Sequence, residues 1–248
     1  MNQIEVTGMI ISATPIGECD RRLLILTKER GKISAFAKGA RRPNSMLVGQ
    51  TSPFVFGVFT LYEGRSSYTV MNIQVNNYFE GLRGDIEGAY YGLYFLELIN
   101  YYTREGNEES ETLGLLYQTL RALTNQKIPN LLIRSIFEIK LITIEGEGPE
   151  VFKSRVSEKP VLENAYFSPQ KGGILKEEER DLATDSFRIL KSTLYTLQYI
   201  VSSRLEKLYT FIVKEEVQKE LSLICERYLK RYIDKKFKSL EILTTIIG

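Results

Sequence analysis

Residues 54–62, FVFGVFTLY, decide the first half of the fold because their apolar side chains alternate around a central glycine. In an extended strand such side chains divide between two faces. One face carries Phe54, Phe56 and Val58, and the opposite face carries Val55, Phe59 and Leu61. Gly57 lies in mid-strand, where a glycine predicts a bulge or a sharp bend. Small closed barrels need bends of this kind.

Four neighbouring segments also have strand patterns: VTGMIISA (6–13), RRLLILT (21–27), KISAFAK (32–38) and TVMNIQV (69–75). In the third, Ile33, Ala35 and Ala37 alternate with Ser34, Phe36 and Lys38; the fourth places Thr69, Met71, Ile73 and Val75 on one face. Five short strands, with a longer connection after the third, predict an OB-type β-barrel over residues 1–80. A small β-sandwich is the alternative.

From residue 81 onward the apolar residues recur at helical spacing. The pattern appears in DIEGAYYGLYFLELINYY (85–102), TLGLLYQTLRAL (112–123) and PNLLIRSIFEIKLITI (129–144). An irregular lobe rich in Gly, Pro and charge follows at about 146–180. Two long helices are then predicted, the first with Phe187, Leu190, Leu194, Leu197 and Val201, the second with Val217, Leu221, Ile224 and Tyr228. We therefore predict a multidomain α+β protein with an α-helical domain over residues 81–248.

The composition argues against an enzyme. The 248 residues include no histidine and two cysteines, which removes the commonest general base, the usual nucleophile pairs and the histidine metal sites. The pattern EGEGPE (145–150) has acids beside its glycines and lacks the setting of a phosphate loop. No signal peptide is recognisable, and the apolar stretch 90–102 is too short to span a bilayer. We expect a cytoplasmic protein without membrane contact.

The formal net charge is only +2, but it is unevenly distributed. Residues 21–42 contain eight cations and one acid, residues 80–111 two cations and eight acids, and residues 227–238 six cations and one acid. A basic strand and loop on a small barrel is the electrostatic pattern of a surface that binds a nucleic-acid backbone. A charge run that merely faces solvent is the alternative.

These segments resemble the bacterial RecO family of DNA repair proteins. The stretch GECDRRLLILTKERGKISAFAKGARRPNS (17–45) resembles the family's N-terminal signature. FEGLRGDIEGAYYGLYFLELIN (79–100) is similar to its first helix, LLIRSIFEIKLI (131–142) to its Arg-x-x-Phe-Glu helix, and YFSPQKGGIL (166–175) to a late Gly-Gly element. The resemblance covers essentially the whole chain, in order.

One feature of that family is missing here. Many members hold a zinc ion with two Cys-x-x-Cys pairs, and the positions that align with them are Ser154, Ser157, Lys176 and Glu179. Serine hydroxyls and a lysine do not replace four thiolates around zinc. We therefore expect a degenerate, zinc-finger-like lobe that folds without metal, and a protein without cofactors. Its core is predicted to contain Val151, Phe152, Tyr166 and Phe167.

The resemblance implies a recombination mediator rather than a catalyst, in a bacterial cytoplasm beside the nucleoid. It implies binding to single- and double-stranded DNA, annealing of complementary strands, and action with RecR to help RecA replace single-strand-binding protein. The phosphate contacts are assigned first to Lys38, Arg41 and Arg42, then to Arg22, Arg30 and Lys32. Such contacts position DNA without reading its sequence.

The resemblance also implies binding of the acidic tail of single-strand-binding protein, which ends in an aromatic residue. Arg134, Phe137 and Lys140 are the candidate receptor, since they combine cations with an apolar surface. The alternative is that Phe137 and Leu141 are core residues and Arg134 pairs with Glu138. Two other functions stay open: a general single-strand-binding OB protein, and an interaction scaffold that does not bind DNA.

Overall fold

The computed structural model describes residues 2–65 and 67–247. The chain forms two compact units, one made of residues 1–120 with 237–248 and the other of residues 121–236. We call them the barrel unit and the helical unit. No helix among the described residues is long and apolar enough to cross a membrane.

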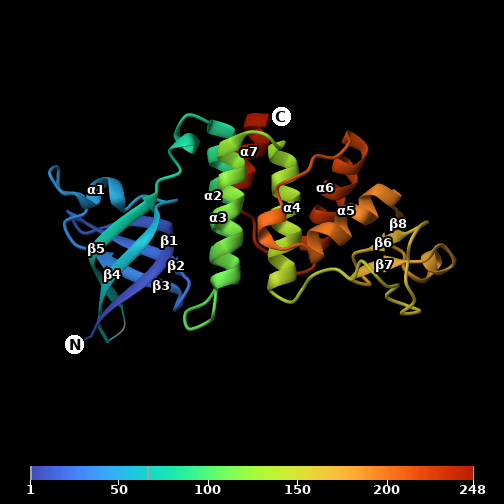
Figure 1. Ribbon diagram of the computed structural model, residues 1–248, viewed down its shortest axis with the longest axis horizontal. Coiled ribbons are helices and arrows are strands. Elements are labelled where there is room, and N and C mark those ends of the chain that lie inside the picture. Colours follow the sequence, from blue (N-terminus) through green and yellow to red (C-terminus); the bar gives the residue numbers. More distant parts are fainter. Residues whose placement is uncertain (1, 66, 248) are drawn as a thin grey trace. The chain divides into compact units, whose positions relative to one another are not determined.

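Five strands build the first part of the barrel unit, drawn in blue to cyan in Figure 1. They are β1 (Asn2–Ile16), β2 (Asp20–Thr27), β3 (Gly31–Ala37), β4 (Phe56–Glu63) and β5 (Tyr68–Asn77). The mixed sheet has the strand order β1-β2-β3-β5-β4, and the antiparallel β1–β4 ladder closes it into a barrel. The β3–β5 junction is parallel and consists of two residue pairs. The predicted five-stranded unit followed by helices is confirmed.

The barrel core contains the side chains that the alternating patterns place inside. Val55, Phe59 and Leu61 are buried, whereas Phe56 and Val58 are half-exposed. In β3 every second residue is buried, from Gly31 to Ala37. The division between two faces that the sequence predicts for β3, and for β4 from Phe56 onward, is therefore confirmed. Phe54 lies before β4, with a φ of +73°.

The face predicted for the start of β5 is wrong. Val70 is buried, and Met71 is 62% exposed. Thr60 and Leu61 of β4 pair with Asn72 and Val70, so Met71 is an extra residue in the β5 ladder. A bulge residue shifts the alternation by one position, which turns the following side chains to the opposite face.

A second bulge lies opposite Gly57, where the sequence predicts a bulge or a bend, and its extra residue is Asn76 of β5. Phe56 pairs with Asn77 but Gly57 pairs with Val75, so the register slips at the glycine. A Cβ atom on Gly57 would lie 2.2 Å from the carbonyl oxygen of Gln74. Only glycine allows the two strands to approach so closely.

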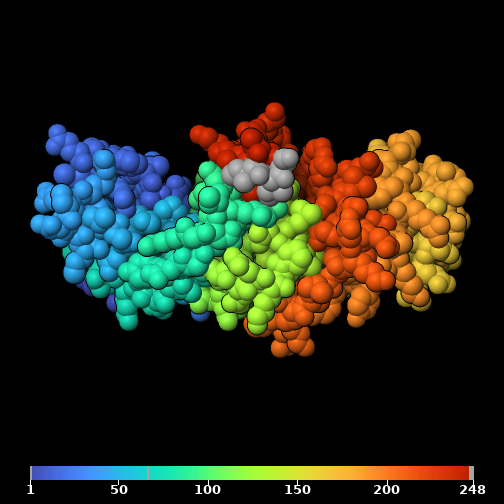
Figure 2. Space-filling view, turned by 90° about the horizontal axis from the view of Figure 1, so that it is seen from above, coloured from blue at the N-terminus to red at the C-terminus, as the bar shows by residue number. Residues whose placement is uncertain are grey.

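Helices complete the barrel unit. They are the short α1 (Leu47–Gln50) and η1 (Glu80–Arg83), then α2 (Ile86–Tyr102), the first part of α3 (Ser110–Asn125) and α7 (Lys238–Ile247). The last of these has no counterpart among the predicted helices. It packs along α2, and it appears in red in Figures 1 and 2. Phe237, just before it, contacts the rings of Tyr94 and Tyr101.

The helical unit contains three long helices and the lobe. The helices are α4 (Asn130–Ile144), α5 (Lys191–Ser202) and α6 (Glu215–Leu229), with a short η3 (Leu205–Lys207) before α6. The lobe has a small sheet in the order β7-β6-β8, made of β6 (Tyr166–Ser168), β7 (Gly173–Leu175) and β8 (Phe187–Arg188), and a 3-10 helix η2 (Glu177–Leu182).

Two details of this unit differ from the prediction. Phe187 pairs with Phe167 in the lobe sheet, so the first closing helix begins only at Lys191. The basic segment 227–238 is not one helix, because α6 ends at Leu229 and α7 begins at Lys238. In both places, contacts remote in sequence override the helical spacing.

The lobe core is only partly the predicted one. Val151 and Phe167 are fully buried, as expected. Phe152, however, is 43% exposed and Tyr166 is half-buried. Ile174 of β7 supplies the missing apolar contact surface.

Candidate nucleic-acid interface

The loop after β3 is held in a fixed shape by its own backbone. The Gly39 N–H donates to Asp20 Oδ1 at 2.7 Å, and the Arg41 N–H donates to the Cys19 carbonyl at 2.8 Å. Gly39 has a φ of +67°, a left-handed conformation that favours glycine. Ala40 is completely buried. The loop is thus anchored to the β1–β2 turn and does not need a ligand to order it.

The three cations of this loop point into solvent. Lys38, Arg41 and Arg42 are exposed, and none of them pairs with a carboxylate among the residues that the structure describes. Arg41 has one long contact, from Nη1 to the Gly17 carbonyl at 3.4 Å. Three positive charges are therefore gathered on one anchored loop and available to an anion.

A row of outward-facing side chains runs across the barrel beside this loop. Arg22 on β2 pairs with Phe36 on β3, Phe36 pairs with Thr69 on β5, and Thr69 pairs with Tyr62 on β4. Phe36 and Tyr62 are half-exposed, and Arg22 Nε donates to Ser34 Oγ at 2.9 Å. Neighbouring strands lie about 4.8 Å apart, so the two rings are about 10 Å apart along the row. The row offers one cation and two aromatic faces.

Arg30 and Lys32 lie at the other end of β3, roughly 20 Å from the loop for a strand of this length. Lys32 Nζ donates to the carbonyl and the Oδ1 of Asn100 on α2, at 2.6 and 2.9 Å. Arg30 Nη1 lies 3.6 Å from Glu63 Oε1. These two cations are already bonded within the barrel unit, so the predicted set of six divides into two groups.

Arg21 shows why charge alone does not identify a binding residue. Its Nη1 donates to the carbonyls of Val48 and Thr51 and to Thr51 Oγ1, at 3.0, 3.3 and 2.7 Å. This guanidinium organises the loop around α1. Tyr62 is a further surface aromatic that was not predicted. It follows the buried Leu61 in the alternation of β4, which indicates that its side chain points outward.

The candidate tail receptor on α4 has the alternative arrangement, in which its apolar side chains are core residues and its arginine pairs within the helix. Arg134 Nε lies 2.7 Å from Glu138 Oε1, and the Glu138 side chain is 1% exposed. Phe137 and Leu141 are completely buried. Lys140 Nζ donates to the carbonyls at the end of α5, those of Val201 and Ser203, at 3.1 and 2.8 Å. These side chains hold helices together inside the helical unit.

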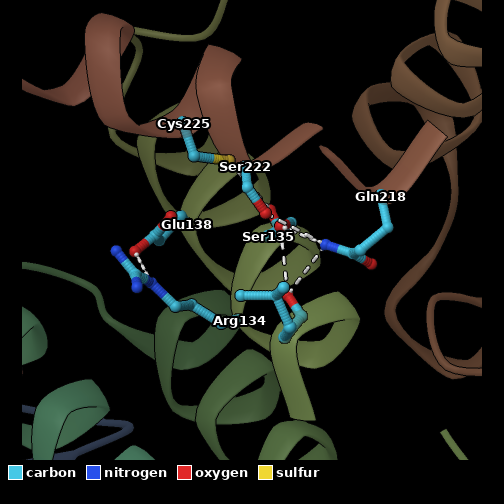
Figure 3. A network of polar contacts seen from close by, with 7 residues as sticks. Arg134, Ser135, Glu138, Gln218, Ser222 and Cys225 are labelled. Carbon is cyan, nitrogen blue, oxygen red and sulfur yellow. Dashed lines mark hydrogen bonds and ion pairs between the residues drawn. The ribbon is translucent and has the colours of Figure 1, made fainter. Parts of the chain in front are cut away.

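Figure 3 shows that further hydrogen bonds connect α4 to α6. The Gln218 amide nitrogen donates to Ser135 Oγ at 3.3 Å and to Ser222 Oγ at 3.2 Å. The Cys225 thiol donates to the Ser135 carbonyl at 3.7 Å. Burial, with the Glu138 carboxylate close by, raises the pKa of this thiol well above its usual range. Cys225 is therefore a protonated packing residue and not a nucleophile.

Ser154, Ser157, Lys176 and Glu179, the positions that the resemblance implied as counterparts of zinc ligands, come together in the lobe. Ser154 Oγ donates to Glu179 Oε2, and the Lys176 N–H donates to the same oxygen at 3.0 Å. Ser157 follows in the turn and donates its N–H to Ser154 Oγ. A single carboxylate with hydroxyls and N–H donors does not fit zinc, which needs four S, N or O ligands with free lone pairs. Among the described residues no three His, Cys, Asp or Glu side chains form a metal-binding group.

Comparisons with known proteins agree along the whole chain. The family model described as "Recombination protein O N terminal" matches residues 1–79, and the one described as "Recombination protein O C terminal" matches residues 83–241. The chain is 32% identical over 246 residues to the DNA repair protein RecO of Acetivibrio thermocellus, covering 99% of this chain and 98% of that protein. It is 32% identical over 241 residues to the DNA repair protein RecO of Alkaliphilus metalliredigens, covering 96% and 98%.

Proposed function

Because this chain belongs to the RecO family, and so to DNA repair and recombination, we propose that it binds single- and double-stranded DNA along its barrel and anneals complementary strands. In this proposal it is a mediator and not an enzyme. With RecR it helps to load RecA onto DNA coated with single-strand-binding protein. We also propose that the barrel is an OB fold. The strand order and the parallel β3–β5 junction of the barrel support this assignment.

The observation that carries the proposal is the cationic loop beside the aromatic row. Lys38, Arg41 and Arg42 supply charge for phosphates, and Phe36 and Tyr62 supply faces for bases. A positive surface with aromatic rings is how proteins hold single strands without sequence preference. Each ring stacks on any base, and each cation contacts a phosphate that is identical at every step.

Annealing follows from the same contacts. Two complementary strands repel each other through their phosphates, and cations on an exposed loop reduce that repulsion. The contacts are exposed and therefore weakened by salt, which lets a strand shift until it is in register. The loop is pre-shaped, so little ordering entropy is lost when DNA binds.

The basic segment 227–238 is a weaker candidate for holding DNA. The Arg227 guanidinium lies 5.1 Å from the centre of the Phe187 ring. Arg231 Nη1 donates to the carbonyls of Pro169 and Gln170, at 2.8 and 2.6 Å. Both side chains support the lobe, so we propose the barrel as the main path of the strand.

The tail of single-strand-binding protein remains a proposed partner, but not at the predicted site. Phe137 is buried, and Lys140 is bonded to carbonyls of the helical unit. We withdraw Arg134, Phe137 and Lys140 as its receptor and keep the partner itself as part of the proposed mediator role.

A strand-annealing assay with bare DNA and with DNA coated by single-strand-binding protein tests the function. A mediator anneals both substrates. A general single-strand-binding protein anneals bare DNA and is blocked by the coat. A scaffold that does not bind DNA anneals neither, and that outcome would overturn the proposal.

A further inference from the structure

Two tight turns of the lobe face each other where the family places its metal ligands. In residues 154–157, the Ser154 N–H donates to the Lys159 carbonyl and the Glu158 N–H donates to the Ser154 carbonyl. In residues 176–179, the Glu179 N–H donates to the Lys176 carbonyl at 3.0 Å. Each turn therefore has a backbone hydrogen bond of its own.

One carboxylate joins the two turns. Glu179 Oε2 accepts from Ser154 Oγ and from the Lys176 N–H, the latter at 3.0 Å. Ser154 Oγ in turn accepts from the N–H groups of Val156 and Ser157, at 3.0 and 3.3 Å. Ser154 is 1% exposed and Glu179 is 7% exposed. The centre of the contact is therefore shielded from water.

We propose that Glu179 takes the structural place of a metal ion, so that its buried carboxylate is the cross-link that closes the lobe. A zinc ion would join two pairs of thiolates by giving them a shared cation. Here the charge is reversed, because a shared anion is held by a hydroxyl and N–H hydrogens. A cation at this point would face those hydrogens instead of free lone pairs.

The cross-link closes a chain segment whose middle already forms the β6–β7 part of the lobe sheet. The Arg155 N–H donates to the Ile174 carbonyl at 2.9 Å, which fastens the first turn to β7. The second turn opens η2 directly after β7. Ser154 and Glu179 are separated by 25 positions, and closing a loop of this length is the role that a metal or a disulfide has in small lobes.

The electrostatics of the site favour the charged form. Burial alone raises the pKa of Glu179, but the hydrogen bonds from Ser154 Oγ and the Lys176 N–H, together with the nearby Ser157 side chain, outweigh it, so that the pKa lies below its usual value. The Lys176 ammonium adds to this effect. The Glu179 side chain is thus a charged carboxylate and a hydrogen-bond acceptor at neutral pH.

Hydrogen exchange of the full chain tests the proposal with Glu179→Gln against Glu178→Gln. Glu178 is the adjacent residue, and its side chain is 73% exposed, so it is the matched control. A lost charge-assisted bond predicts about 10- to 100-fold faster exchange across residues 150–180 in Glu179→Gln only. Ser154→Ala, which removes the donor and keeps the carboxylate, should have the same local effect. Equal exchange in both Gln variants would overturn the proposal.

A second variant tests the geometry without relying on destabilisation. Replacing Ser154, Ser157, Lys176 and Glu179 together by cysteine should yield a protein that binds about one zinc per chain and regains slow exchange across the lobe when loaded. The parent protein, titrated with zinc alone, should bind none at this site. Saturable zinc binding by the parent that Glu179→Gln abolishes would overturn the proposal, as would a quadruple variant that folds but takes up no zinc.

Discussion

At the scale of single residues, the cations around β3 differ in what their side chains already contact. Lys38, Arg41 and Arg42 point into solvent from an anchored loop. Lys32 and Arg21, in contrast, donate to carbonyl oxygens of neighbouring segments. A lysine bonded to helix carbonyls must break those bonds to reach a phosphate, so proximity in sequence does not make these cations equivalent.

The triple variant Lys38→Ala, Arg41→Ala, Arg42→Ala should weaken single-strand binding for every sequence alike. Losing three phosphate contacts should reduce the slope of log affinity against log salt by about 2, at roughly 0.7 per contact. The change in unfolding free energy should stay under about 0.5 kcal/mol because the side chains are exposed.

The matched control for this variant removes three exposed lysines from the helical unit, Lys191, Lys207 and Lys219. It carries the same change of net charge and should keep both the affinity and the salt slope. Fluorescence titrations at several salt concentrations measure both variants. An equal loss in the two proteins would indicate a general effect of charge and no loop site.

Phe36→Ala and Tyr62→Ala should each weaken single-strand binding by about 1–3 kcal/mol while leaving the salt slope unchanged, because stacking releases no counterions. Met71→Ala is the control. Met71 lies on β5 and is exposed as well, but it has no aromatic ring. Titrations of both ring variants that match the parent would remove the aromatic row from the DNA path.

At the scale of elements, one strand end and one turn are fixed by charged groups. Lys32 on β3 caps the last turn of α2 through the carbonyl and side chain of Asn100. Glu179 joins the start of η2 to the turn at Ser154. Each contact connects two elements that are distant in sequence, and each is partly or fully shielded from water.

Lys32→Ala should cost about 1.5–3 kcal/mol in unfolding free energy, because hydrogen bonds to a charged donor are lost at a helix end. The salt slope of DNA binding should stay at the parent value. Urea denaturation measures the first quantity. A stable variant with a reduced salt slope would instead identify Lys32 as a phosphate contact.

The stability that Glu179 contributes should depend on pH in a defined direction. Its pKa in the folded lobe lies below the ordinary 4.5. Its contribution is therefore fully present above pH 4.5 and is lost as the pH falls through the folded-state pKa. Exchange across the lobe should differ between the parent and Glu179→Gln at pH 7 and converge in acid; a constant difference across this window would contradict the assignment.

At the scale of the whole molecule, the chain returns to its first unit at its end. Phe237 is 6% exposed against Tyr94 and Tyr101, and Leu243 of α7 is 2% exposed. The barrel unit is therefore discontinuous in sequence. The helical unit is inserted between two segments of the barrel unit.

Removing residues 237–248 should destabilise the barrel unit, although they lie far in sequence from the rest of that unit. Phe237→Ala alone should cost about 3–5 kcal/mol, because a large buried ring leaves a cavity. Hydrogen exchange across α2 measures the effect, and α6 of the helical unit is the internal reference. A deletion that leaves exchange across α2 unchanged would show that α7 is a dispensable tail.

The sequence by itself determined the five strands, the helices over 85–144, the division of the β3 and β4 side chains between two faces, and the irregularity at Gly57. These features follow from local rules, since alternation and helical spacing are set by backbone geometry. It also indicated the cationic loop and the positions Ser154 and Glu179.

The tertiary structure alone decided the extra residue at Met71, the strand at Phe187 and the place of α7. Each of these depends on which distant segment lies opposite, and a local period contains no information about that partner. For the same reason, only tertiary structure separates the exposed Lys38 from the bonded Lys32. Lys32 lies on β3 and Lys38 directly follows that strand, and what distinguishes them is that Lys32 bonds to a carbonyl 68 positions away.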